Sequence, residues 1–102
     1  MHEKIIKECI KNNNFEWRKH ALIRMAERDI AQNDILKVIL QGEIIEMYPN
    51  DTPYPSCLML GKIREKIYHV VIALDEADKF LYIITAYEPS IKKFDILGKK
   101  RR

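Results

Sequence analysis

The stretch NDILKVILQGEIIEMY, residues 33–48, decides the fold because its hydrophobic repeat changes at Gly42. Before this glycine, apolar residues recur at the spacing of one helix face, and after it the repeat shortens to that of a strand. We therefore predict a helix over residues 33–41, with Gly42 as its left-handed C-terminal cap, and a strand over residues 44–48.

Two more helices are predicted upstream, over residues 2–11 and 18–28. On the second of these, Leu22, Met25 and Ala26 share one face, which we expect to point into the core.

Three more strands are predicted downstream, over residues 57–63, 67–74 and 80–87, because these segments are rich in β-branched and aromatic residues. Short turns join them, so an antiparallel meander is expected. The sequence thus predicts an α+β fold in a single domain of residues 1–102, with two to three N-terminal helices packed on a four-stranded antiparallel meander. The segment Phe15-Glu16-Trp17 is predicted to be only a short extended link.

Charge is unevenly distributed along the chain. Of the 18 basic residues, four are the last four of the chain, which leaves 14 against 15 acidic residues and a net charge of −1 elsewhere. Any affinity for nucleic acid must therefore come from a local cluster or from this tail. We expect the tail to be disordered, and the alternative is a contact between the RNA backbone and Lys99, Lys100, Arg101 and Arg102.

Several classes of protein are not expected. No apolar run approaches the roughly 18–20 residues of a membrane span, and the charged N-terminus lacks the apolar segment of a signal peptide. Cys9 and Cys57 have no metal-ligand spacing and are predicted to be buried thiols in a reducing compartment. We therefore expect a cytoplasmic protein with no metal or other cofactor, since the three histidines are scattered and no Gly-rich phosphate loop is present.

The second predicted helix carries the first candidate site. His20, Arg24 and Arg28 follow one another at four-residue intervals and line a single stripe. Guanidinium groups bind phosphate bidentately, and an imidazole titrates near neutral pH. This stripe therefore suggests an anionic partner, whereas the alternative is a solvated face on which Glu27 and Asp29 neutralise the arginines.

The predicted sheet carries the second candidate site. The expected turn lengths place His69 opposite Gly61 on one neighbouring strand and near Thr85 on the other, with Tyr87 diagonal to it on the same face. These groups would form the wall of a polar cleft, and the alternative is a hydrogen-bonded histidine in the core.

The proline-rich loop after the first strand is the third candidate. Tyr54 and Ser56 lie in the stiff segment Pro53-Tyr54-Pro55-Ser56 and could present a ring and a hydroxyl to RNA bases. Turns of this composition are also common structural elements, which is the alternative.

Several of these motifs together resemble a family of uncharacterised small bacterial domains, over roughly residues 15–90. One departure is visible, because this family usually has glycine where Asp29 stands and a capping serine where Ala31 stands. The residues that carry the resemblance are, in chain order, His20-Ala21, Arg24-Met25, Arg28, Ile30, Gly42-Glu43-Ile44-Ile45-Glu46, Tyr48-Pro49, Pro53-Tyr54-Pro55-Ser56-Cys57-Leu58, Gly61, His69-Val70-Val71 and Ile84-Thr85-Ala86-Tyr87-Glu88-Pro89.

That family resembles the RelE-like toxins in fold, and its members are often encoded beside zinc-finger antitoxins similar to MqsA. The resemblance implies the toxin of a type II toxin–antitoxin pair, an endoribonuclease that cleaves mRNA, including mRNA on the ribosome, and is neutralised by its cognate zinc-finger antitoxin. The alternative is a non-catalytic RelE-like module that binds a partner protein or nucleic acid.

RNA cleavage without a metal needs a base near the 2′-hydroxyl, cations on the phosphate and an acid for the leaving oxygen. The residues predicted to be catalytic are His20, Arg24, His69 and Tyr87. His20 or His69 would be the base or the acid, and Tyr87 or Ser56 a supporting donor. Arg24 and Arg28 would hold the phosphate. This hypothesis requires the helix stripe and the face of His69 to border one cleft.

Overall fold

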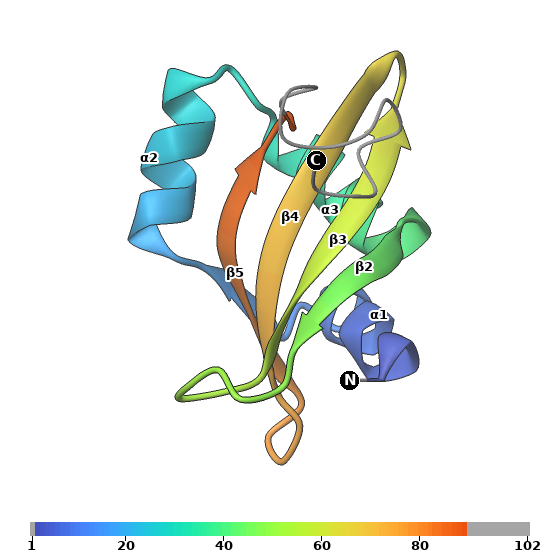
Figure 1. Cartoon of the computed structure of the whole chain (residues 1–102), viewed down its shortest axis with the longest axis vertical. Helices are drawn as coiled ribbons and strands as arrows, with labels where there is room; N and C mark the ends of the chain where they lie inside the picture. Colours follow the sequence, from blue (N-terminus) through green and yellow to red (C-terminus); the bar gives the residue numbers. More distant parts are fainter. Residues whose placement is uncertain (1, 90–102) are drawn as a thin grey trace.

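The computed structural model describes residues 2–89, which form three helices and a five-stranded sheet (Figure 1). The basic residues 99–102 lie outside the described residues, so the expectations for this tail are not addressed by the fold. None of the described helices is long and apolar enough to cross a membrane. The elements are, in chain order, α1 (Glu3–Lys11), β1 (Phe15–Trp17), α2 (Lys19–Glu27), α3 (Gln32–Gln41), β2 (Glu43–Tyr48), β3 (Ser56–Ile63), β4 (Lys66–Asp75) and β5 (Phe80–Tyr87).

The strands form one mixed sheet in the order β1-β5-β4-β3-β2. Strands β2 to β5 form the predicted antiparallel meander. The prediction of four strands was incomplete, because Phe15–Trp17 is a fifth strand that pairs in parallel with β5. Three residues are too few to show a strand repeat, and their pairing depends on a partner more than 60 positions away.

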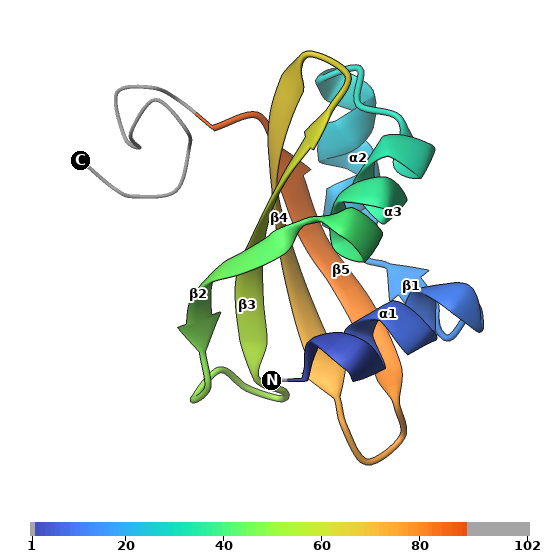
Figure 2. The same cartoon turned by 90° about the vertical axis from the view of Figure 1, so that its right-hand side faces the viewer.

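All three helices lie on one side of the sheet (Figure 2), which confirms the predicted α+β architecture. Apolar side chains of the helices and of this sheet face form the core, with Ile6, Met25 and Val38 among the helical members. We call the opposite side of the sheet the open face, because none of the described helices covers it.

The buried side of α2 differs from the prediction. Ala21 and Met25 are buried, whereas Leu22 is 38% exposed and Ala26 is also exposed. Because α2 lies beside β5 at the edge of the helix layer (Figure 1), only a narrow stripe of it reaches the sheet.

The end of α2 accounts for the departure at Asp29. This residue has a φ of 56°, in the left-handed region that favours glycine. The amide of Ile30 donates to the carbonyl of Met25 at 2.9 Å, and the amide of Asp29 donates to that of Ala26 at 3.3 Å. These two bonds form a Schellman motif, so a glycine would fit this position at a lower conformational cost.

Gly42 does not adopt the left-handed conformation that was predicted, since its φ is −80° and its ψ is −171°. Glycine is instead required by close packing. A Cβ atom at this position would lie 2.3 Å from the carbonyl oxygen of Leu60 and 2.5 Å from that of Val38.

The predicted register of His69 was wrong by one residue on β3. His69 pairs with Leu60, and Gly61 pairs with Tyr68, because the β3–β4 turn has two residues and Ile63 pairs with Lys66. Gly61 therefore faces the helices, where a Cβ atom would lie 2.9 Å from Cγ1 of Val38.

The register on β5 also differs from the prediction. Tyr87, expected as a diagonal neighbour, lies directly opposite His69, while Thr85 lies opposite Val71. An irregularity between Val71 and Ile72 shifts the pairing of β4 and β5, and sequence patterns rarely reveal such a bulge.

Candidate active site

A row of four paired residues crosses the open face. Glu43 pairs with Leu60, Leu60 with His69, and His69 with Tyr87, so β2, β3, β4 and β5 each contribute one side chain. Directly paired residues of neighbouring strands point to the same face of a sheet. We call these four residues the central row.

His69 and Tyr87 form the polar pair of the central row. The Nδ1 atom of His69 lies 3.4 Å from the hydroxyl oxygen of Tyr87, and the two rings meet edge to face with centroids 5.4 Å apart. The imidazole is completely buried, with 0% of its surface exposed. The structure therefore brings together two of the four residues predicted to be catalytic, in a protected position on the sheet.

Arg28 lies next to this pair. It follows α2 as its C-cap, and its Nη1 atom donates to the carbonyl oxygen of Ala86 at 3.0 Å. Ala86 precedes Tyr87 and lies beyond the segment of β5 that β1 covers, so its carbonyl is free to accept from a side chain. One guanidinium of the predicted stripe is thus anchored beside the central row.

The other two members of the stripe are exposed on α2. Arg24 pairs with Glu27 at 3.5 Å, and the side chains of both are more than half exposed. Among the described residues, Arg28 is the member of the helix stripe that is bonded beside the sheet site.

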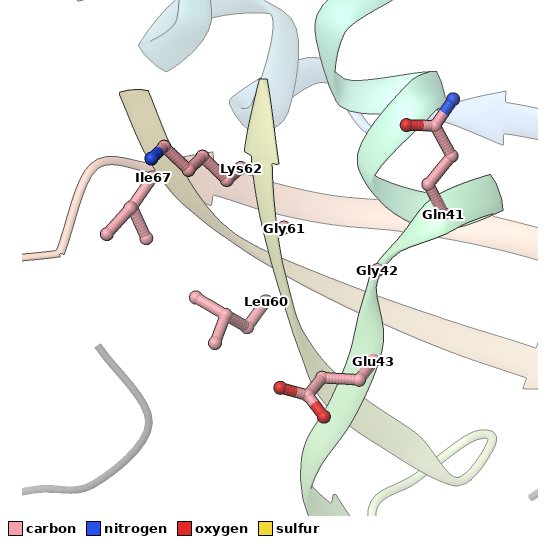
Figure 3. A pocket seen from close by; sticks show the side chains of 7 residues that line it. All are labelled: Gln41, Gly42, Glu43, Leu60, Gly61, Lys62 and Ile67. Atoms are coloured by element: carbon pink, nitrogen blue, oxygen red, sulfur yellow. The ribbon is translucent and has the colours of Figure 1, made fainter. Parts of the chain in front are cut away.

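A pocket of about 440 Å³ borders the central row on the β2 and β3 side, and we call it the Leu60 pocket. Leu60 and Glu43 belong both to this pocket and to the central row. Figure 3 shows their side chains and that of Ile67 extending to one side of the sheet, while Gln41 points away from it at the end of α3.

A second pocket of about 160 Å³ lies further along the open face, and we call it the Tyr82 pocket. The sheet contributes Ser56, Val71, Ala73, Tyr82 and Ile84 to its lining. The remaining lining residues are Arg18, Asp51, Thr52, Pro53 and Tyr54.

Two predicted RNA contacts, Tyr54 and Ser56, lie in the Tyr82 pocket. The ring of Tyr54 stacks on that of Tyr82, with centroids 5.4 Å apart and an interplanar angle of 4°. The Ser56 hydroxyl donates to the carboxylate of Asp51. The proline-rich loop thus folds back over the open face instead of extending into solvent.

Sequence reasoning missed Arg18 and Tyr82. The guanidinium carbon of Arg18 lies 4.7 Å from the centre of the Tyr82 ring, although the two residues are 64 positions apart. Only the pairing of β1 with β5, which brings the start of α2 to this strand, makes them neighbours.

Charge differs between the two edges of the sheet. Cationic side chains follow the start and length of α2, at Arg18, Lys19, Arg24 and Arg28, although Arg18 pairs with Glu16 and Arg24 with Glu27; β2 carries Glu43 and Glu46. An anionic polymer would therefore be attracted to the α2 and β5 side and repelled from the β2 side.

The cysteines are buried and free, as expected. Burial raises the pKa of the Cys57 thiol to about 12, so it is protonated and inert at neutral pH. Within residues 2–89, no three His, Cys, Asp or Glu side chains are grouped so that they could hold a metal ion.

The fold and the site define a small α+β domain with a buried histidine–tyrosine pair on the sheet face that none of the described helices covers. Residues 17–88 match the family described as "Domain of unknown function (DUF4258)", and the chain belongs to this family. The match includes α2, the complete meander and both His20 and His69, and it begins after α1. Neither a curated protein nor a solved structure matches the chain.

Proposed function

We propose that the chain is a cytoplasmic RelE-like toxin that cleaves mRNA without a metal ion, on the open face of its sheet, and that a zinc-finger antitoxin neutralises it. The His69–Tyr87 pair carries this proposal, because it places an imidazole and a phenol within 3.4 Å of each other. The packing of helices on one face of an antiparallel meander agrees with the fold that the RelE-like resemblance implies.

The pair can supply both proton transfers of RNA cleavage. Neutral His69 takes the proton of a 2′-hydroxyl, whose oxygen attacks the adjacent phosphorus. The bond from phosphorus to the 5′-oxygen breaks, and the Tyr87 hydroxyl gives its proton to that oxygen. The products are a 2′,3′-cyclic phosphate and a 5′-hydroxyl end.

The same pair can restore itself after each reaction. His69 then carries one extra proton and Tyr87 lacks one, and transfer across their 3.4 Å contact returns both to the starting state. Arg28, held at the neighbouring carbonyl of Ala86, supplies positive charge for the phosphorane.

One observation favours a second function. Because the His69 imidazole has no exposed surface, RNA contacts it only after a local opening of its surroundings. A non-catalytic binding module, in which His69 and Tyr87 only stabilise the sheet, needs no such opening.

Cleavage of a labelled single-stranded RNA by the purified chain separates the two functions. We expect His69→Gln and Tyr87→Phe each to reduce the rate at least about 100-fold, because proton-transfer groups contribute roughly 10²–10⁴-fold. His2→Gln is the matched control, because His2 is exposed and is the residue before α1, outside the sheet. A His20→Gln variant reports separately on the helix stripe.

Thermal unfolding of each variant shows whether the fold is intact. Full activity of His69→Gln with an unchanged melting temperature contradicts the catalytic proposal. A wild-type chain that binds RNA or a partner protein but leaves RNA intact supports the binding module.

A further inference from the structure

We infer that the Tyr82 pocket binds one base of the RNA and selects a base that carries an exocyclic amino group. This inference rests on the proposed function, because it assigns part of the same substrate to a second place on the open face.

The lining of the Tyr82 pocket has the parts that a nucleobase requires. Its floor is apolar, formed by Val71 and Ala73 of β4 and Ile84 of β5. The planar guanidinium of Arg18, which also pairs with Glu16 at 3.8 Å, lies at one side, and the loop with Asp51 forms another. A flat apolar surface with a few polar groups at its edge is typical of sites that bind unpaired bases.

The aromatic part of the pocket is already ordered. The Tyr82 ring contacts Arg18 at 4.7 Å, the parallel ring of Tyr54 at 5.4 Å and the edge-on ring of Phe80 at 5.2 Å. The charge of Asp75 raises the pKa of Tyr54. Because these planar groups are held before RNA arrives, stacking a base on them costs little ordering.

Asp51 supplies the selectivity. Its carboxylate accepts a hydrogen bond from the hydroxyl of Ser56, a residue that is only 4% exposed. This bond fixes the direction of the carboxylate. A carboxylate has about four acceptor positions, so others remain for a ligand. The amino group of cytosine donates to such an acceptor, whereas uracil presents a carbonyl oxygen at the same position and is repelled.

The pocket is close enough to the central row to act on the same strand of RNA. Val71 in its floor is two residues from His69 on the same strand and face, a separation of about 7 Å. A base in the pocket therefore brings the adjoining backbone to the His69–Tyr87 pair, beside which Arg28 is held at the carbonyl of Ala86.

The test uses two 2′-O-methyl RNA hexamers, which have no 2′-hydroxyl and cannot be cleaved by the proposed chemistry. One is hexauridine, and the other has a single central cytidine. We expect the wild-type chain to bind the cytidine hexamer about tenfold more tightly in fluorescence anisotropy, since one good base contact is worth roughly 1–3 kcal/mol.

Three variants separate stacking from selectivity. Arg18→Ala and Tyr82→Ala should weaken binding of both hexamers about tenfold, in line with the value of one stacked base. Asp51→Asn should abolish the preference for cytidine while uridine binding is kept. Lys37→Ala, an exposed cation on α3, is the charge-matched control and should bind like the wild type within about twofold.

Equal binding of the two hexamers by the wild type, or no binding of either, overturns the inference. Arg18 is exposed, so Arg18→Ala removes no core side chain. If this variant binds RNA as tightly as the wild type, the inference is overturned even when Tyr82→Ala fails to fold. These binding results are independent of cleavage. If the binding pattern holds but no RNA is cut, only the proposed nuclease activity is contradicted. If cleavage depends on His69 but binding shows no preference for cytidine, only the assignment of the Tyr82 pocket is contradicted.

Discussion

Gly61→Ala tests the register on which the whole open face depends. In the observed register, Gly61 faces α3, and its new Cβ atom would lie 2.9 Å from Cγ1 of Val38 and 3.1 Å from its Cα. Carbon atoms in ordinary contact are about 3.5–4.0 Å apart, so the overlap is roughly 0.5–1 Å. Because one of the atoms belongs to the helix backbone, α3 itself has to move.

The expected loss of stability follows from two opposing effects. Inserting a methyl group into a packed interface costs about 1–3 kcal/mol. Replacing glycine in a strand returns about 0.5–1 kcal/mol of backbone entropy. The net destabilisation is therefore about 0–2.5 kcal/mol with a centre slightly above 1 kcal/mol, which lowers the melting temperature of a domain of this size by roughly 5–10 °C.

Thermal and urea unfolding of the purified variant measure this loss. The neighbouring Lys62→Ala is the control, because Lys62 is exposed and a surface change of this kind stays within about 0.5 kcal/mol. An unchanged melting temperature for Gly61→Ala, together with a loss of RNA binding, would show that Gly61 lies on the open face beside His69 and would refute the register.

Three further predictions concern stability. Asp29→Gly should raise the melting temperature by a few degrees, about 0.5–1 kcal/mol, because the left-handed φ of 56° favours glycine, and a lower value would contradict this account. Asp34 is only 5% exposed, and its carboxylate lies 2.6 Å from the guanidinium of Arg64. Arg64→Ala removes this partner and should lower the free energy of unfolding in urea by about 1–2 kcal/mol; no loss would mean that water replaces the arginine. The Cys57 thiol has a pKa near 8.5 in the unfolded chain and of about 12 in the folded one. Above about pH 8.5 the unfolded chain loses this proton first, so the free energy of unfolding should fall by up to about 1.4 kcal/mol per pH unit. Cys57→Ala should flatten this alkaline slope, and an unchanged slope would assign it to another group.

Local sequence patterns were sufficient for most of the secondary structure. The predicted helix over residues 33–41 differs from α3 by one residue, and β5 has the predicted bounds Phe80–Tyr87. Both segments have a clear repeat that reflects one buried face. The strand β1 was missed because its three residues are stabilised by pairing with β5 and not by a pattern of their own.

The candidate site was only partly predictable, because it depends on register. His69 and Tyr87 were expected on one face and lie there, but the pairing of His69 with Leu60 depends on a single residue in the β3–β4 turn. A shift of one residue moves every side chain to the other face, so the role of Gly61 was misassigned. Arg18 and Tyr82 meet through tertiary packing alone, which no local motif reports.

The end groups of cleaved RNA test the central claim most directly. After incubation of a short RNA with the wild-type chain and with His69→Gln of equal thermal stability, mass spectrometry should detect 2′,3′-cyclic phosphate and 5′-hydroxyl ends with the wild type only. The same ends at the same rate with His69→Gln would show that the imidazole of the central row takes no part in the reaction.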